Sequence, residues 1–191
     1  MCKFSLLALT TLFWAGGSLL RAQEPSRADN RNRLRNGSFE GSLAYWPEHG
    51  ILDPSTAADG SFSVRLEKKG RLRSGPFFLT PGKKVVISLW AKSANRGDTV
   101  NLSITPSNRN VGQKSGWAWN GKRQWRGSLD TSWKFFRWEI MIPAVNDKGS
   151  FIGSNIGWWN GRSWIMMIGK RGKGPVWVDG ISVHYDGSVK T

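Results

Sequence analysis

Tryptophan is the most frequent aromatic residue in this chain of 191 residues, with 12 copies. Trp14 lies in the N-terminal apolar run, and the other 11 divide between two kinds of segment. Four lie in short apolar runs typical of β-strands: Trp90, Trp133, Trp138 and Trp177. Seven lie in or beside connections rich in Gly, Asn and Arg: Trp46, Trp117, Trp119, Trp125, Trp158, Trp159 and Trp164. An indole ring has a flat apolar face and one N–H donor, which suits a sugar ring whose apolar face is rimmed by hydroxyl groups. The tryptophans in the connections therefore point first to carbohydrate.

Two long connections, residues 105–130 and 143–163, hold most of the candidate binding residues. Trp117 and Trp119 alternate along the chain, so in an extended loop they share a face and form one wall of a groove. Arg162 follows two adjacent tryptophans, and its guanidinium group can pair with carboxylates or sulfates or stack on rings. The alternative is that these tryptophans form a second small core at the ends of the domain. The predicted ligand-binding residues are Trp117, Trp119, Trp125, Trp158, Trp159, Arg126, Arg162 and Trp90.

Short strands must position these side chains, because apolar runs alternate with turn signals from Leu34 onward. The predicted strands cover residues 61–66, 84–91, 99–104, 132–142, 164–168 and 175–183. In the second of these, Val85, Ile87 and Leu89 share one side, which leaves Trp90 on the other as a platform if that side is concave. No window has the 3.6-residue apolar stripe and the caps of a helix. We therefore predict an all-β domain, a two-sheet sandwich or barrel.

The first 22 residues have the pattern of a secretory signal peptide, with Lys3 before an apolar run and Ala22 before a polar segment. The run is too short and too broken by Gly for a stable membrane span; an uncleaved anchor is the alternative. We predict a flexible leader at residues 23–34, one domain at residues 35–186 and a tail at residues 187–191. Cys2, the only cysteine, lies in the signal peptide, so a secreted or periplasmic domain would have no disulfide.

The chain is strongly basic, with a formal net charge of +15. The predicted signal peptide contains Lys3, Arg21 and no acid, so its removal would leave +13. A positive field of this size favours anionic partners and weakens with salt. Because export argues against nucleic acid, we expect an acidic or sulfated polysaccharide or another anionic envelope component. The alternative is a basic exported protein whose charge has no specific ligand.

Side chains suited to catalysis are sparse in this sequence. The two histidines, His49 and His184, lack metal-binding spacing, and no Ser-centred elbow is present. Glu40, Glu48 and Asp53 are close enough in sequence to form the carboxylate pair of a glycosidase. We expect no enzymatic activity. The alternatives are a small glycoside hydrolase or polysaccharide lyase of jelly-roll type, and a structural cell-envelope protein that binds a protein partner.

Three segments, taken in order with the strand around Trp133, resemble a known family. They are the opening Asn36-Gly-Ser-Phe-Glu40 followed by Trp46, the central residues 79–93, and the closing residues 176–183. Together they resemble the carbohydrate-binding modules of families four, nine and twenty-two, the cellulase-C type. The resemblance implies a β-sandwich jelly roll of the galactose-binding-like kind that binds glycan chains without cleaving them. Such modules are often joined to glycoside hydrolases, so a separate partner enzyme is also expected.

The same resemblance implies a structural calcium ion. The family often holds one with a carboxylate from each of the first and last strands, which here correspond to Glu40 and Asp179. The loop at Asp59 would supply further oxygen ligands, the type that calcium prefers. The alternative is that Asp179 only caps an Asp-Gly turn and Glu40 is solvated.

Overall fold

We describe a computed structural model of the protein, for residues 31–47, 50–67, 70–106, 124–142, 144 and 163–186. The predicted signal peptide, most of the predicted leader and the tail lie outside these residues. The described residues form ten strands and no helix, so none of their elements is a helix long and apolar enough to span a membrane. The strands are β1 (Ile51–Asp53), β2 (Ser63–Leu66), β3 (Arg71–Arg73), β4 (Phe77–Phe78), β5 (Lys84–Ser93), β6 (Thr99–Pro106), β7 (Gln124–Ser128), β8 (Lys134–Met141), β9 (Ser163–Arg171) and β10 (Val176–Tyr185).

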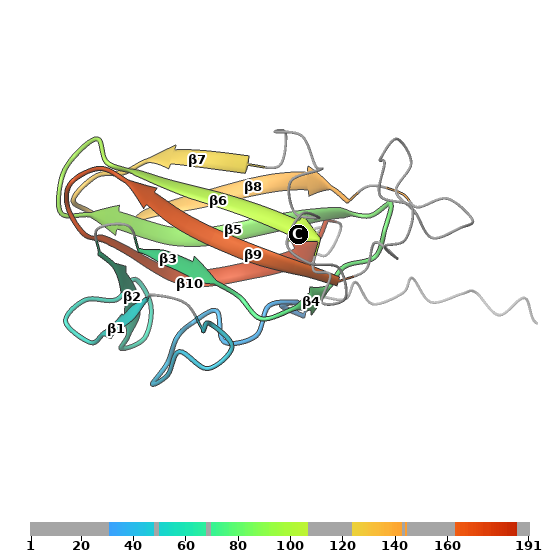
Figure 1. Cartoon of the computed structure of the whole chain (residues 1–191), viewed down its shortest axis with the longest axis horizontal. Coiled ribbons are helices and arrows are strands. Elements are labelled where there is room, and N and C mark those ends of the chain that lie inside the picture. The colour runs from blue at the N-terminus through green and yellow to red at the C-terminus, as the bar shows by residue number, and fades with distance from the viewer. Residues whose placement is uncertain are drawn as a thin grey trace, which may run out of the picture.

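The strands form two antiparallel sheets stacked face to face (Figure 1). Sheet A has the order β1-β2-β10-β5-β8, and sheet B has the order β3-β9-β6-β7, with β4 also paired to β9. The last strand, β10, lies between β2 and β5, so the beginning and end of the domain meet in one sheet. The predicted all-β sandwich of two sheets is therefore confirmed.

Side-chain alternation explains why each sheet has one buried face. In β5, Val85, Ile87 and Leu89 are buried, whereas Val86 and Trp90 are half-buried on the outer side. This is the pattern expected for a strand with one face in the core and the other toward solvent. In the strand predicted at 132–142, the alternation of the sequence places Phe136, Trp138, Ile140 and Ile142 on one face, and these residues are more buried than the exposed residues that alternate with them. The predicted segment 164–168 is the interior strand β9.

Two tryptophans that the sequence placed with the connections belong to the core. Trp46 is 1% exposed, packs on Phe39 with ring centroids 5.4 Å apart, and donates its Nε1–H to the Asn36 carbonyl oxygen at 2.9 Å. Trp164 is fully buried in β9. The neighbouring Gly- and Asn-rich sequence does not show which way an indole ring points, although Trp164 also begins the predicted strand 164–168. A satisfied N–H group is what allows Trp46 to be buried without a penalty.

The two outer faces of the sandwich differ in how they are covered. On sheet A, the connection between β1 and β2 folds back over β10 and β5, where Lys92 Nζ donates to Thr56 Oγ1 at 2.7 Å. Trp177 Nε1 donates to Asp53 Oδ2 at 2.9 Å on the same face. On sheet B, polar residues of β3, β9, β6 and β7 border a groove on the outer face.

Candidate functional site

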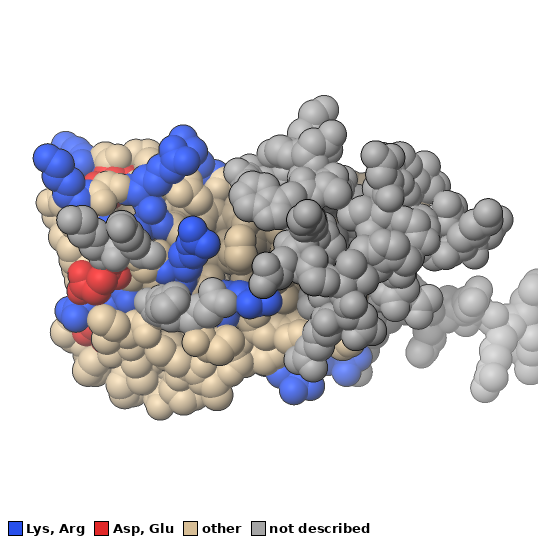
Figure 2. Space-filling model, in the orientation of Figure 1, with Lys and Arg blue, Asp and Glu red and all other residues tan. Residues whose placement is uncertain are grey.

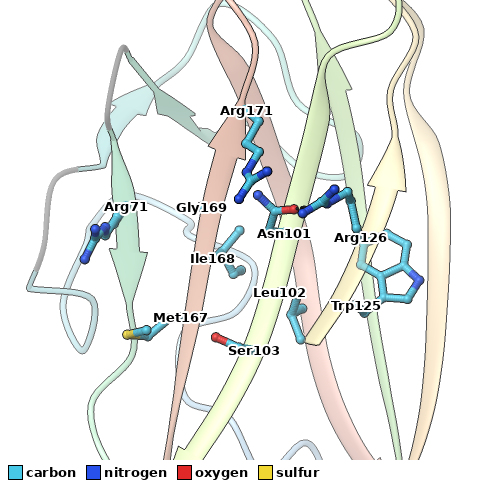
Figure 3. Close-up of a pocket in the computed structure, with 10 residues that line it drawn as sticks. All are labelled: Arg71, Asn101, Leu102, Ser103, Trp125, Arg126, Met167, Ile168, Gly169 and Arg171. Atoms are coloured by element: carbon cyan, nitrogen blue, oxygen red, sulfur yellow. Dashed lines mark hydrogen bonds between the residues drawn. The ribbon is translucent and has the colours of Figure 1, made fainter. Parts of the chain in front are cut away.

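A groove of about 450 Å³ crosses the outer face of sheet B. It takes its residues from all four strands of the path β3-β9-β6-β7 (Figure 3). The lining residues are Arg71, Asn101, Leu102, Ser103, Trp125, Arg126, Met167, Ile168, Gly169 and Arg171. Because a groove on a sheet is open along its length, it can accept a chain as well as a single small molecule.

Strand register places the central residues of the groove in one row. Arg71 pairs with Gly169, Gly169 pairs with Asn101, and Asn101 pairs with Arg126. Residues that alternate with these, such as Leu102, are buried in the core, so the row points outward. Gly169 forms a bare floor in this row, since a Cβ atom built on it would meet no atom within 4 Å. Backbone alone therefore forms the floor of the groove at Gly169.

The groove is electropositive. Arg71, Arg126 and Arg171 are exposed, and none of the described lining residues carries a carboxylate. Arg126 Nε donates to Asn101 Oδ1 at 2.9 Å, which fixes the direction of its guanidinium group. Figure 2 shows Lys and Arg side chains gathered on this face of the molecule. Like charges brought together without acidic partners raise the local concentration of anions, so this surface favours an anionic ligand.

Two of the predicted binding residues lie at this groove. Arg126 is exposed and points along the groove toward Asn101 (Figure 3). Trp125 is half-buried, and its ring packs on Phe136 with centroids 4.8 Å apart, so it contributes to the inter-sheet core as well as to the groove wall. The predictions for Trp117, Trp119, Trp158, Trp159 and Arg162 fall outside the described residues.

Trp90 lies on the opposite face of the molecule from the groove. It projects outward from sheet A and packs on Phe135, with ring centroids 5.1 Å apart. Phe135 is 49% exposed, and Lys92 Nζ lies 5.2 Å from the rings of both Trp133 and Trp177. The structure thus confirms that Trp90 faces outward but does not bring it together with Trp125 and Arg126. A single strand cannot show which of the two outer faces it will belong to.

The carboxylates predicted to bind calcium approach one loop. Asp179 Oδ2 accepts the N–H groups of Ala58 and Asp59 at 2.8 and 3.1 Å, and both oxygens of Glu40 accept the N–H of Ser61. Burial raises the pKa of Asp179, and the nearby Glu40 charge adds to this rise, while the backbone N–H groups oppose it.

These oxygens keep further lone pairs, which a hard cation could use. Within the described ranges, however, no three His, Cys, Asp or Glu side chains are grouped to hold a metal ion. The Asp59 side chain is exposed. Calcium therefore stays a prediction from the sequence, and the carboxylates hold the loop through hydrogen bonds.

The acids considered for catalysis have separate structural partners. Asp53 is buried; its pKa is lowered first by the hydrogen bond from Ser55 and then by that from Trp177, against an opposing effect of burial. Glu40 instead bonds to Ser61, and Glu48 and His49 lie outside the described residues. The arrangement of Asp53 is that of a structural carboxylate that holds its own strand to β10.

Sequence reasoning missed most of the groove. Arg71, Asn101, Ser103, Gly169 and Arg171 were not among the predicted binding residues, although they are all on strands. The signal for them in the sequence is the polar half of each alternating strand, which marks residues that point away from the core. A strand pattern identifies an outward residue, but it does not show which outward residues of four strands share one surface.

The two-sheet sandwich is similar in fold to solved jelly-roll structures of carbohydrate-binding modules. The CBM22-1 xylan-binding domain from Paenibacillus barcinonensis Xyn10C has a TM-score of 0.52 at 10% identity, with 82% of this chain and 95% of that chain covered. The C-terminal family 22 carbohydrate-binding module of Clostridium thermocellum Xyn10B has a TM-score of 0.50 at 14% identity, with 84% and 99% covered. A family 16 carbohydrate-binding module has a TM-score of 0.50 at 13% identity, with 80% and 99% covered.

These similarities are similarities of fold. They confirm the jelly-roll sandwich that the sequence resemblance implied. At such low identities, the ligand of one protein does not predict the ligand of another. No protein-family model matches the sequence, and a comparison with curated proteins finds no significant match. Function must therefore be argued from the groove itself.

Proposed function

We propose that this protein binds acidic polysaccharide non-covalently in the groove of sheet B. The observation that carries the proposal is a groove of about 450 Å³ with three exposed arginines, and with no carboxylate among the described residues that line it. Guanidinium groups pair with carboxylate and sulfate oxygens through two parallel N–H donors. A solvated polar groove without a deep apolar cavity suits a hydroxylated chain more than a hydrophobic small molecule.

The fold supports a glycan as the source of this anion. Two modules with the same fold are named for xylan binding or for carbohydrate binding in a cleft. The groove described here differs in chemistry, because Arg71, Arg126 and Arg171 are its charged groups. Tryptophans of the two long connections would add stacking platforms, as the sequence predicts. The ligand class that satisfies both fold and charge is a polysaccharide with carboxylate or sulfate substituents.

We further propose that the protein acts outside the cytoplasm and binds its glycan without cleaving it. The signal-like segment after Lys3 supports export, so the module would meet its glycan outside the cytoplasm. Binding without cleavage fits a groove whose described lining contains no carboxylate pair and no histidine. Such a module would hold a substrate for a separate enzyme rather than transform it.

A glycan array of neutral, uronic and sulfated chains, read at low and high salt, tests this proposal. We expect binding to acidic chains that weakens with salt but persists for one glycan, because hydrogen bonds and stacking remain when the charge is screened. Equal binding to every polyanion that disappears with salt would mean that charge alone acts, and would favour an envelope protein. Retention of neutral chains only would show that the arginines do not select the ligand.

A further inference from the structure

One end of the groove contains a compact group of hydrogen-bond donors. Asn101 lies between Arg126, its partner on β7, and Gly169, its partner on β9. Arg171 is two residues beyond Gly169 and pairs with Thr99, so it is a diagonal neighbour of Asn101 on the same face. Diagonal neighbours on a sheet are roughly 7–8 Å apart, within reach of long side chains. In Figure 3 the guanidinium groups of Arg126 and Arg171 both lie close to the Asn101 amide.

The existing hydrogen bond orients this group and leaves donors available. Arg126 uses Nε to bond Asn101 Oδ1 at 2.9 Å, so its two Nη groups are directed elsewhere. The Asn101 amide has its oxygen engaged, and its Nδ2 group therefore faces away from Arg126 as a donor. Arg171 is exposed, and within the described part of the chain no hydrogen bond or ion pair engages it. Three donor groups thus surround the space above Gly169.

The shape of this space distinguishes two kinds of anion. A carboxylate is planar, so its acceptor directions lie near one plane, and the fork of one arginine can pair with both of its oxygens. A sulfate half-ester has three free oxygens in a tetrahedral arrangement and can accept from several directions at once. The backbone at Gly169 has open space directly above it, because a Cβ atom there would meet nothing within 4 Å, and we place the bulkier group in that space. Donors from three strands around a bare floor match the tetrahedral group better than the planar one.

We propose that Arg126, Asn101 and Arg171, with Gly169 as the floor, form a subsite for a sulfate half-ester carried by a sugar ring. This inference rests on the proposed function and narrows its ligand from acidic glycans in general to sulfated ones. The remaining arginine of the groove, Arg71, is the register partner of Gly169 on β3, where it would meet the part of the glycan that flanks the sulfated sugar. A phosphate monoester shares the tetrahedral chemistry, so the experiment must separate it from sulfate.

The test compares matched glycans on the exported full chain by isothermal titration calorimetry. The ligands are a sulfated polysaccharide, the same backbone after chemical desulfation, a polyuronate, and a phosphorylated mannan. We expect the sulfated chain to bind about tenfold or more tightly than its desulfated form, as charge-assisted hydrogen bonds would give. Arg171→Gln and Asn101→Ala should reduce that preference to about twofold, and Arg171→Lys, which keeps the charge but loses the fork, should recover it only in part.

Arg137→Gln is the matched control, because Arg137 is on sheet A, is 54% exposed and pairs with Glu139 at 2.8 Å. It removes the same charge from the other face and should leave the sulfate preference unchanged. If Arg171→Gln lost the same factor of affinity for the sulfated chain and for the polyuronate, the sulfate subsite would be overturned, whereas the proposed binding of acidic glycans would stand. Tighter binding of the phosphorylated mannan would overturn the assignment to sulfate. Failure of the wild-type protein to bind any glycan would refute the proposed function and the subsite together.

Discussion

Filling the floor of the groove is the sharpest test of where the ligand binds. Gly169 lies in the interior strand β9, and a Cβ atom at this position would meet nothing within 4 Å. Its φ is outside the left-handed region that would favour glycine. A methyl group at this position therefore meets open space, and Gly169→Leu should extend an isobutyl group from it into the groove. The groove then loses depth in the middle of the row that joins Arg71, Asn101 and Arg126.

The expected effects on stability and on binding have opposite directions. Replacing a strand glycine reduces the entropy of the unfolded chain, so the free energy of unfolding should stay constant or rise by about 0.5–1 kcal/mol. Glycan affinity should fall at least about tenfold, which is about 1.4 kcal/mol. The reason is that a sugar ring displaced from the floor of the groove loses its hydrogen bonds to Asn101 and the arginines beside it. Gly169→Ala, which adds one methyl group, should give a smaller loss.

Calorimetric titration with the best glycan, together with thermal unfolding of each variant, measures both quantities. A graded loss of affinity from Gly to Ala to Leu at constant melting temperature would place the ligand in the groove of sheet B. Undiminished binding by a folded Gly169→Leu protein would refute this location. A large drop in melting temperature would instead show that the space above Gly169 is not open, and the argument from its geometry would fail.

Four further predictions concern other parts of the molecule. Trp46→Ala should lower the free energy of unfolding by about 3–5 kcal/mol in denaturant titrations, because it empties a fully buried site; a loss below 1 kcal/mol would contradict its place in the core. Trp117→Ala combined with Trp119→Ala should abolish glycan retention in affinity electrophoresis with little change in melting, whereas a large loss of stability would support a second core. Calcium should raise the melting temperature of chelator-treated protein if the predicted site is real, and an unchanged value would count against it. The pKa of Asp53 in the folded protein lies below its ordinary value of 3.8, so the unfolded state binds more protons just below pH 4. The stability that this carboxylate contributes is therefore complete above that range and is lost as the pH falls through the lowered pKa. The difference in melting temperature between wild type and Asp53→Asn should shrink below about pH 4, and a difference that stays constant down to pH 3 would refute this assignment.

The sequence by itself determined the class of the fold. Alternation in segments such as 84–91 shows which side chains enter a core, and this local pattern persists because the period of a strand is two residues. The faces of β5 and β8 were predictable for this reason. The meeting of Glu40 and Asp179 at one loop followed from the resemblance, since it joins the first and last parts of the domain.

The site was decided by the tertiary structure. Which outward residues share a surface depends on strand order and register, and these are set by packing between segments distant in sequence. Arg71 and Arg126 share a row because the registers of β3 with β9, β9 with β6 and β6 with β7 align them through Gly169 and Asn101. Trp90 belongs to the other sheet. The burial of Trp46 likewise depends on the Asn36 carbonyl that accepts its N–H. Residue type and spacing predict which way a strand residue points, but the groove exists only once four strands are placed side by side.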